Sequence, residues 1–187
     1  VPSKPGDDVV SQLGRLGLAP ADVAYVANSH WHFDHCGGNE FFPDATILVQ
    51  AREMQAARSP EILAQGRYRP SAPDYEHPLY YHDVDGEHDV FGDGSVVLFP
   101  TYGHTPGHQV LVVRLPKTGP VMLSGDMVHL QYSWNFRVAP SFNFDVAQSM
   151  ATIDAMKAYA QKTGAQLWIN HDMEQNAKIP KAPASVQ

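Results

Sequence analysis

Four side chains of types that bind metal ions stand within six consecutive positions of the chain, in the order H-x-H-x-D-H. They are His30, His32, Asp34 and His35, and the turn-forming segment Cys36-Gly37-Gly38 follows at once. Alternate side chains of an extended segment point to the same side, so His30 and His32 can hold one ion. Asp34 and His35 come where the two glycines let the chain turn, and we expect them to face elsewhere. The spacing therefore favours two metal ions over one.

Three further candidate ligands follow predicted strands or lie in the loops between them: His108 in H-T-P-G-H, Asp126 in S-G-D and His171 in N-H-D. Imidazole and carboxylate are ligands of Zn²⁺ and similar divalent ions. The seven ligands divide into His30, His32 and His108 for the first ion, Asp34, His35 and His171 for the second, and Asp126, with a hydroxide, as the bridge. Two such ions lie about 3.5–4 Å apart and lower the pKa of a bound water toward roughly 7. This pattern predicts a hydrolase with two divalent ions, and Zn²⁺ is the expected metal.

Other residues of the same types have simpler expected roles. His104 lies four residues before His108, and a turn through Thr-Pro-Gly need not aim both rings at one ion, so we expect His104 to support a ligand. Cys36 is the only cysteine, which excludes an internal disulfide and an all-thiolate zinc site. We expect its side chain to fill the tight turn. Surface positions are expected for His77, His82 and His88.

The composition indicates one globular domain that acts on a small molecule. The chain has 187 residues, of which 43% are hydrophobic, and a formal net charge of -7 without any Lys/Arg cluster. A nucleic-acid or anionic-membrane binder would carry a basic patch. No apolar run approaches the roughly 20 residues that span a bilayer, so a soluble protein without a membrane span is expected. The start Val1-Pro2-Ser3 leaves the compartment open between cytoplasm, periplasm and secretion.

The hydrophobic pattern predicts alternating strands and helices, with candidate ligands at strand ends. Helices are expected at 8–16, 52–57 and 146–163, the last with Asp145 as its N-cap and Gly164 at its end. Strands are expected at 46–49, 95–99, 109–115, 121–124 and 167–169, and a buried strand at 23–27 delivers the histidine motif. Residues 66–82 are interpreted as a long loop and residues 172–187 as an extended tail.

Taken together, the motifs H-x-H-x-D-H-x-G-G, H-T-P-G-H, S-G-D and N-H-D resemble those of the metallo-β-lactamase superfamily, over essentially the whole chain. The resemblance implies an α/β fold, an αββα sandwich, as a single domain over 1–187. It implies the same seven metal ligands. The family has N-terminal strands ahead of the first motif, and only a short helix and strand precede His30. We therefore expect the chain to be a fragment of a longer protein.

Within this superfamily the motifs are most similar to those of N-acyl homoserine lactonases, on His32-Phe33-Asp34-His35, Thr105-Pro106-Gly107-His108-Gln109 and 171–175. The resemblance implies lactone ring opening of the quorum-quenching type by a metal-bridging hydroxide. An aspartate at 126 disfavours a true β-lactamase, and His32 disfavours the redox members, which carry Glu there. The alternatives are phosphotriester or aryl-ester hydrolysis, and a metal-binding module without turnover.

The implied mechanism gives further residues a role. Asp34 is placed to move a proton from the attacking water to the leaving alkoxide. His129 stands where many lactonases carry a tyrosine that polarises the substrate carbonyl. Aromatic candidates for a wall against an acyl tail are Trp31, Phe33, Tyr132, Trp134, Phe136 and Phe142. The expected partners are a small lactone or ester and, among macromolecules, a second copy in a homodimer; no nucleic acid is expected.

Overall fold

The first sheet of the computed structural model contains three parallel strands in the order β1 (Tyr25–Ala27), β2 (Thr46–Gln50), β3 (Tyr80–Val84). The structure describes residues 4–68 and 79–187. In β2, which lies between the two others, four of the five residues are buried. A continuous apolar run such as Ile-Leu-Val suits a strand that is covered on both faces.

The second sheet has five strands in the order β4-β5-β6-β7-β8. They are β4 (His88–Asp89), β5 (Val96–Pro100), β6 (Gln109–Leu115), β7 (Gly119–Leu123) and β8 (Gln166–Trp168). The strands from β4 to β7 are antiparallel, whereas β8 runs parallel to β7. A parallel neighbour needs a long crossover connection, and the helix α6 (Val146–Thr163) lies in that connection.

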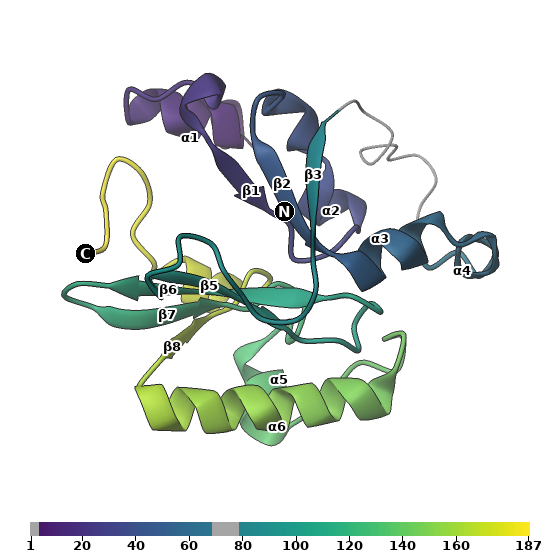
Figure 1. Ribbon diagram of the computed structural model, residues 1–187. Coiled ribbons are helices and arrows are strands. Elements are labelled where there is room, and N and C mark those ends of the chain that lie inside the picture. The colour runs from purple at the N-terminus through teal and green to yellow at the C-terminus, as the bar shows by residue number, and fades with distance from the viewer. Residues whose placement is uncertain (1–3, 69–78) are drawn as a thin grey trace.

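The helices lie outside the two sheets, so the molecule is layered (Figure 1). In that view α6 and the short helix α5 lie below the second sheet, whereas α1 and α3 lie on the side of the first sheet. The bounds of the remaining helices are α1 (Val9–Arg15), α2 (Phe33–Cys36), α3 (Ala51–Arg58), α4 (Pro60–Ala64), α5 (Gln131–Phe136) and α7 (Met173–Asn176).

Alternation along the strands explains these layers. In β2, Leu48 packs between the sheets with Leu98 of β5, while its neighbour Val49 packs on the other face with Met54 of α3. In β6, Val110 and Val112 pack against α6, with which they share a core cluster. Successive side chains of a strand point to opposite faces, so each sheet is covered on both sides.

Most predicted elements are confirmed within a residue or two. The long C-terminal helix has the predicted caps: the Asp145 side chain accepts from the backbone N–H of Gln148, and Gly164 ends the helix at φ 74°. The strands expected at 109–115 and 121–124 are present as β6 and β7 and pair as an antiparallel hairpin. No helix among the described residues is long and apolar enough to cross a bilayer.

Three predictions from the pattern are wrong. The expected loop at 66–82 ends too late, because Tyr80–Val84 form β3, where pairing with β2 outweighs a largely polar composition. His77 and residues 69–78 lie outside the described residues. The strand at 23–27 is not buried: Tyr25 is 46% exposed, because β1 is an edge strand of the described sheet. The tail taken as extended contains α7, which Asp172 caps by accepting from Gln175.

Candidate metal centre

The first motif changes direction at His32, which is extended and precedes the single turn of α2. His30 therefore stands on the extended approach from β1, whereas Asp34 and His35 stand on the helical turn, as the motif predicts. A buried amide pair holds this bend, because Asn28 donates to the backbone oxygen of His35 and exchanges hydrogen bonds with Asn39. The two halves of the motif are thereby fixed in different directions.

The inner ligand group brings together four side chains whose ligand atoms all lie within 4.8 Å of one another: His30, His32, His104 and Asp126. Asp126 Oδ2 lies 3.4 Å from Nε2 of His104 and 3.9 Å from Nε2 of His30. His30 and Asp126 are almost fully buried, at 0% and 4% exposure. The buried Nε2 of His30 has no hydrogen-bond partner among the described residues, as expected of an atom that binds an ion.

Outer hydrogen bonds fix which ring nitrogens of the inner group carry protons. Nε2 of His32 lies 3.2 Å from the backbone oxygen of Arg67, and Nδ1 of His104 lies 3.1 Å from Oδ1 of Asn143. Both oxygens are acceptors, and the amide of Asn143 is oriented by its donation to Ser149. Nδ1 of His32 and Nε2 of His104 are then unprotonated, yet they lie 3.2 Å apart. Two facing lone pairs at this distance repel each other unless a cation lies beside both.

The outer ligand group consists of Asp34, His35 and His171. Nε2 of His35 lies 3.5 Å from Oδ2 of Asp34 and 3.2 Å from Oδ1 of Asp126, and Nε2 of His171 lies 3.1 Å from the same Asp126 oxygen. Asp126 therefore turns one carboxylate oxygen to each group. The side chains of Asp34 and His171 are 42% and 41% exposed, so solvent and small molecules reach this group.

The structure places His104, and not the expected His108, among the side chains of the inner group. Both nitrogens of the fully buried His108 are occupied, since Nδ1 lies 2.7 Å from Oγ1 of Thr101 and Nε2 accepts from the backbone N–H of Asp126. His108 thus supports Asp126, and His104 is the ring of H-T-P-G-H that is placed to bind an ion. The sequence pattern favoured His108, but the spacing of the two rings alone does not show which of them faces the other ligands.

Burial keeps the inner imidazoles neutral. It lowers the pKa of His30 and His32, and that of His104 to about 4. Neutral imidazole is the form that binds metal ions, so these side chains are ready at pH 7. Burial raises the pKa of Asp126, but hydrogen bonds from His129 and His35 outweigh it and the net direction is downward. Asp126 is therefore a carboxylate.

His129 faces the same centre. Its Nε2 lies 3.2 Å from Oδ2 of Asp126, its ring stacks on that of His171 with centroids 5.5 Å apart, and its edge meets Phe142. It follows Asp126 by three positions in the sequence, and the turn between them brings both to one place. His129 is thus positioned beside both ligand groups.

The predicted aromatic wall is only partly at the surface. Trp31 is 4% exposed within a core cluster, and Trp134 is partly buried against the core with Lys157 over its ring. Phe33, Tyr132, Phe136 and Phe142 are at least half exposed. An indole buries a large apolar area, so Trp31 contributes to the core and the exposed rings are the ones that a substrate could contact.

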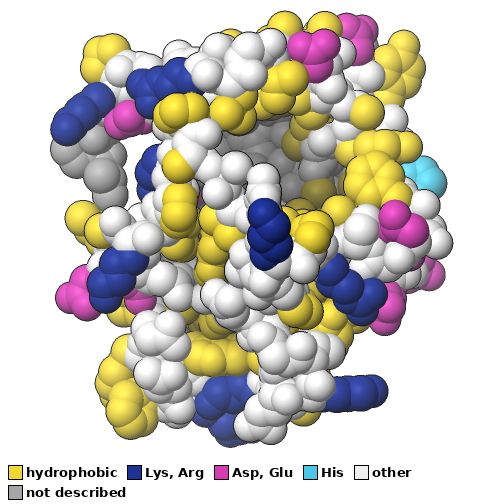
Figure 2. Space-filling model, turned by 90° about the vertical axis from the view of Figure 1, so that its left-hand side faces the viewer, with side chains coloured by type: hydrophobic (Ala, Val, Ile, Leu, Met, Phe, Trp, Pro, Cys, Tyr) yellow, Lys and Arg dark blue, Asp and Glu magenta, His cyan; other side chains and the backbone are white. Residues whose placement is uncertain are grey.

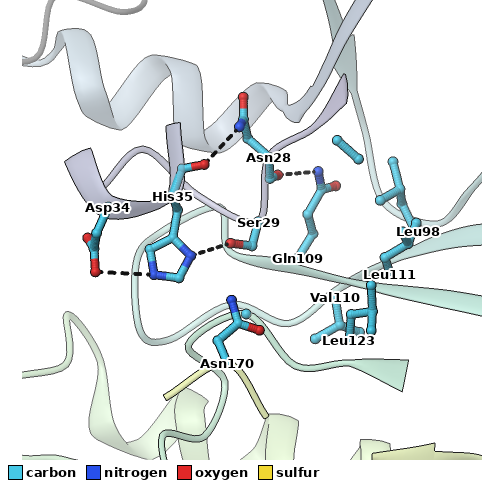
Figure 3. A pocket seen from close by; sticks show the side chains of 12 residues that line it. Asn28, Ser29, Asp34, His35, Leu98, Gln109, Val110, Leu111, Leu123 and Asn170 are labelled. Atoms are coloured by element: carbon cyan, nitrogen blue, oxygen red, sulfur yellow. Dashed lines mark hydrogen bonds and ion pairs between the residues drawn. The ribbon is translucent and has the colours of Figure 1, made fainter. Parts of the chain in front are cut away.

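Two hollows lie on either side of the centre. One of about 270 Å³ has Asp34, His35 and Asn170 at one end and Leu98, Leu111 and Leu123 at the other, as Figure 3 shows. The other, of about 440 Å³, adjoins His32 and His104 and is lined by Arg67, Tyr68, Phe142 and Phe144. Figure 2 shows that the face to the left of Figure 1 is hollowed, with hydrophobic side chains at the rim.

The loop that carries His104 lies directly against α3. A Cβ atom on Gly107 would come within 2.2 Å of the backbone nitrogen of Glu53. We expect Gly107→Ala to lower the free energy of unfolding by roughly 3 kcal/mol or more, because backbone must separate from backbone. Urea unfolding measures this change. Gly14→Ala in α1, where a Cβ meets nothing within 4 Å, is the matched control and is expected to be neutral or stabilising by up to about 1 kcal/mol. Equal midpoints for the two variants would contradict the close approach.

Comparison with known proteins gives the chain clear relatives. The family model described as the metallo-beta-lactamase superfamily matches residues 3–163. The N-acyl homoserine lactonase AttM of Azorhizobium caulinodans is 37% identical over 179 residues, which cover 93% of this chain and 67% of that protein. An N-acyl homoserine lactonase of Bacillus cereus is 32% identical, over 90% of this chain and 64% of that protein.

Solved structures agree. An N-acyl homoserine lactone hydrolase, determined with the product N-hexanoyl-L-homoserine bound at its catalytic metal centre, superposes with a TM-score of 0.83 and 31% sequence identity. The match covers 98% of this chain and 69% of that one. The chain thus spans about two thirds of the length of these relatives.

Proposed function

Because the chain belongs to the metallo-beta-lactamase superfamily, we propose that it hydrolyses N-acyl homoserine lactones at this centre, opening the lactone ring. One observation carries the proposal. Unprotonated ring nitrogens of His32 and His104 lie 3.2 Å apart beside the carboxylate of Asp126, an arrangement that a bound cation would stabilise. The resemblance to lactonases over 93% of the chain supports the substrate class.

The residues fit two divalent ions, with Zn²⁺ as the expected metal. His30, His32 and His104 would hold the first, and Asp34, His35 and His171 the second, with Asp126 shared between them. All seven side chains offer nitrogen or carboxylate oxygen, the donor set that zinc prefers in catalytic sites. Two bound ions would supply Lewis acidity for the lactone carbonyl and a water acidified toward neutral pH.

The protein's own side chains would bind, orient and move protons. As the water oxygen bonds to the carbonyl carbon and the ring C–O bond breaks, the water loses a proton and the ring oxygen gains one. Asp34, which is 42% exposed and 3.5 Å from His35, is placed to carry that proton. His129, with Nε2 turned toward the centre, is placed to donate a hydrogen bond to the developing oxyanion. The product is the open-chain hydroxy acid.

The two hollows and the exposed rings provide space for the rest of the substrate. Phe33 lines a further hollow of about 200 Å³ with His32, Asp34 and Arg67, beside the exposed outer ligands. An acyl chain against Phe33 and Phe142 would remove apolar surface from water at about 25 cal/mol per Å². Both rings are at least half exposed, so an acyl chain can reach them.

Removing metal tests the proposal directly. Wild-type protein is expected to convert N-hexanoyl homoserine lactone to the hydroxy acid, followed by mass spectrometry or proton release. Dialysis against a chelator is expected to abolish turnover, and added Zn²⁺ is expected to restore it. A nitrophenyl phosphotriester is the comparison substrate. Metal-loaded protein that captures the lactone without forming product would refute the proposal, as would full activity after demetallation.

A further inference from the structure

Glu53, on α3, is a fully buried acidic side chain outside the ligand set. It is 0% exposed, and no Lys, Arg or His of the described residues forms an ion pair with it. Taking a carboxylate out of water without a cation is costly unless hydrogen bonds replace the lost hydration. The environment of Glu53 must therefore supply donors.

Three donors point at the carboxylate, and each comes from a different segment. Oε1 accepts from the backbone N–H of Trp31 and from the hydroxyl of Tyr68, both at 2.9 Å, and Oε2 accepts from the backbone N–H of Gly107 at 2.8 Å. Two of these donors are backbone N–H groups, which cannot reverse their role. The site therefore suits a carboxylate better than a neutral amide of the same shape.

Each of the three segments controls a ligand of the inner group. Trp31 stands between His30 and His32. Its indole N–H also donates to Sδ of Met54, which follows Glu53 on α3. Tyr68 follows Arg67, whose backbone oxygen holds Nε2 of His32. Gly107 lies in the loop of His104, and its lack of a Cβ lets that loop reach Glu53. One side chain thus ties together the supports of all three inner imidazoles.

Burial raises the pKa of Glu53, and the hydrogen bonds that it accepts oppose part of that rise. The carboxylate contacts the segments that carry the inner imidazoles and is not one of the candidate ligands itself.

We propose that Glu53 is a positioning residue that sets the metal affinity of the inner group, by holding its three supporting segments in register. The inference rests on the metal binding in the proposed function, and it concerns affinity, not turnover. Outer partners of metal ligands typically change metal affinity 10–100-fold when they are replaced.

Glu53→Gln tests the proposal because the amide has the size of the carboxylate but replaces one accepting oxygen by an NH₂ group. That NH₂ group then faces an N–H or O–H donor and cannot accept its hydrogen bond. We expect one of two bound Co²⁺ ions to bind 10–100-fold more weakly, measured by competition with a chromophoric chelator. The visible absorption of the Co²⁺-loaded protein should change as well. Gln50→Leu is the matched control: Gln50 is equally buried, just before α3, and its side chain bonds Gly86, Gln109 and the hydroxyl of Tyr102, but none of the three donors to Glu53. It should lower the melting temperature and leave both Co²⁺ affinities unchanged.

An unchanged Co²⁺ affinity and spectrum in folded Glu53→Gln would overturn the proposal and leave Glu53 a merely structural residue. If Glu53→Gln does not fold, Tyr68→Phe decides, since it removes one donor and keeps the carboxylate. A severalfold loss of Co²⁺ affinity at one site is expected there, and no loss would overturn the proposal. Wild-type protein that binds two Co²⁺ but leaves a lactone intact would reject the proposed function and leave this test valid.

Discussion

Asp126→Ala is expected to remove both metal ions and to lower the rate of lactone hydrolysis by at least about 10³-fold. Asp126 is the shared side chain of the centre, with Oδ2 at 3.4 Å from His104 and Oδ1 at 3.1 Å from His171. Without it, each group keeps three candidate ligands, and those of the inner group are all imidazoles, with no carboxylate among them. The remaining imidazoles then face one another across a buried space, where a divalent charge is poorly compensated. Elemental analysis and a rate assay on the same preparation measure the two effects.

The matched control is Asp154→Ala, which removes an exposed carboxylate that forms an ion pair with Arg137 and senses the charge of Lys157 on the surface. Exposed ion pairs contribute about 0–1 kcal/mol, so this variant should keep two ions and its full rate. Retention of both ions by Asp126→Ala would mean that the carboxylate does not bridge, and the two groups would have to be treated as separate sites.

The second large effect separates the two histidines of H-T-P-G-H. His104→Ala is expected to leave one ion per chain and to reduce the rate by about 10²-fold or more, because His104 faces the inner ion position. His108→Ala is expected to keep two ions and most of the rate. His108→Ala is expected to lower the free energy of unfolding by about 2–4 kcal/mol, because a fully buried ring is removed and the backbone N–H of Asp126 loses its acceptor.

If this assignment holds, His104→Ala loses more metal than His108→Ala, whereas His108→Ala loses more stability to urea than His104→Ala. Loss of an ion from His108→Ala, with two ions kept by His104→Ala, would restore the assignment that the sequence motif favoured.

The elements that could be predicted are those whose signals are local. The helix α6 has its N-cap Asp145 and its terminal Gly164 in the sequence, and β6 and β7 are joined by a short turn. The strand β3 has no such signal, because its polar residues become a strand only through pairing with β2. The local sequence pattern predicts a strand correctly where intrinsic propensity and pairing with other strands agree. It fails where pairing alone determines that a segment is a strand.

The ligand set followed the same rule. The residue types at 30, 32, 34 and 35, with the bend at His32, are visible in the sequence because the motif is contiguous. The choice between His104 and His108 depends on which ring meets Thr101 and which meets Asn143, and neither contact is local in the chain. Glu53 was invisible for this reason too, since its partners come from three distant segments.

The unequal burial of the two ligand groups affects how fast each ion can be exchanged. Asp34 and His171 stand about two fifths exposed, so an incoming chelator can compete for the outer ion by stepwise ligand replacement. The inner ion would be held by His30, His104 and Asp126, all nearly inaccessible, and would be reached from the hollow beside the half-buried His32. A chelator therefore meets fewer exposed ligand atoms at the inner position than at the outer one, and the inner ion is expected to exchange more slowly. A difference in exchange rate would allow hybrid centres with a different metal in each position.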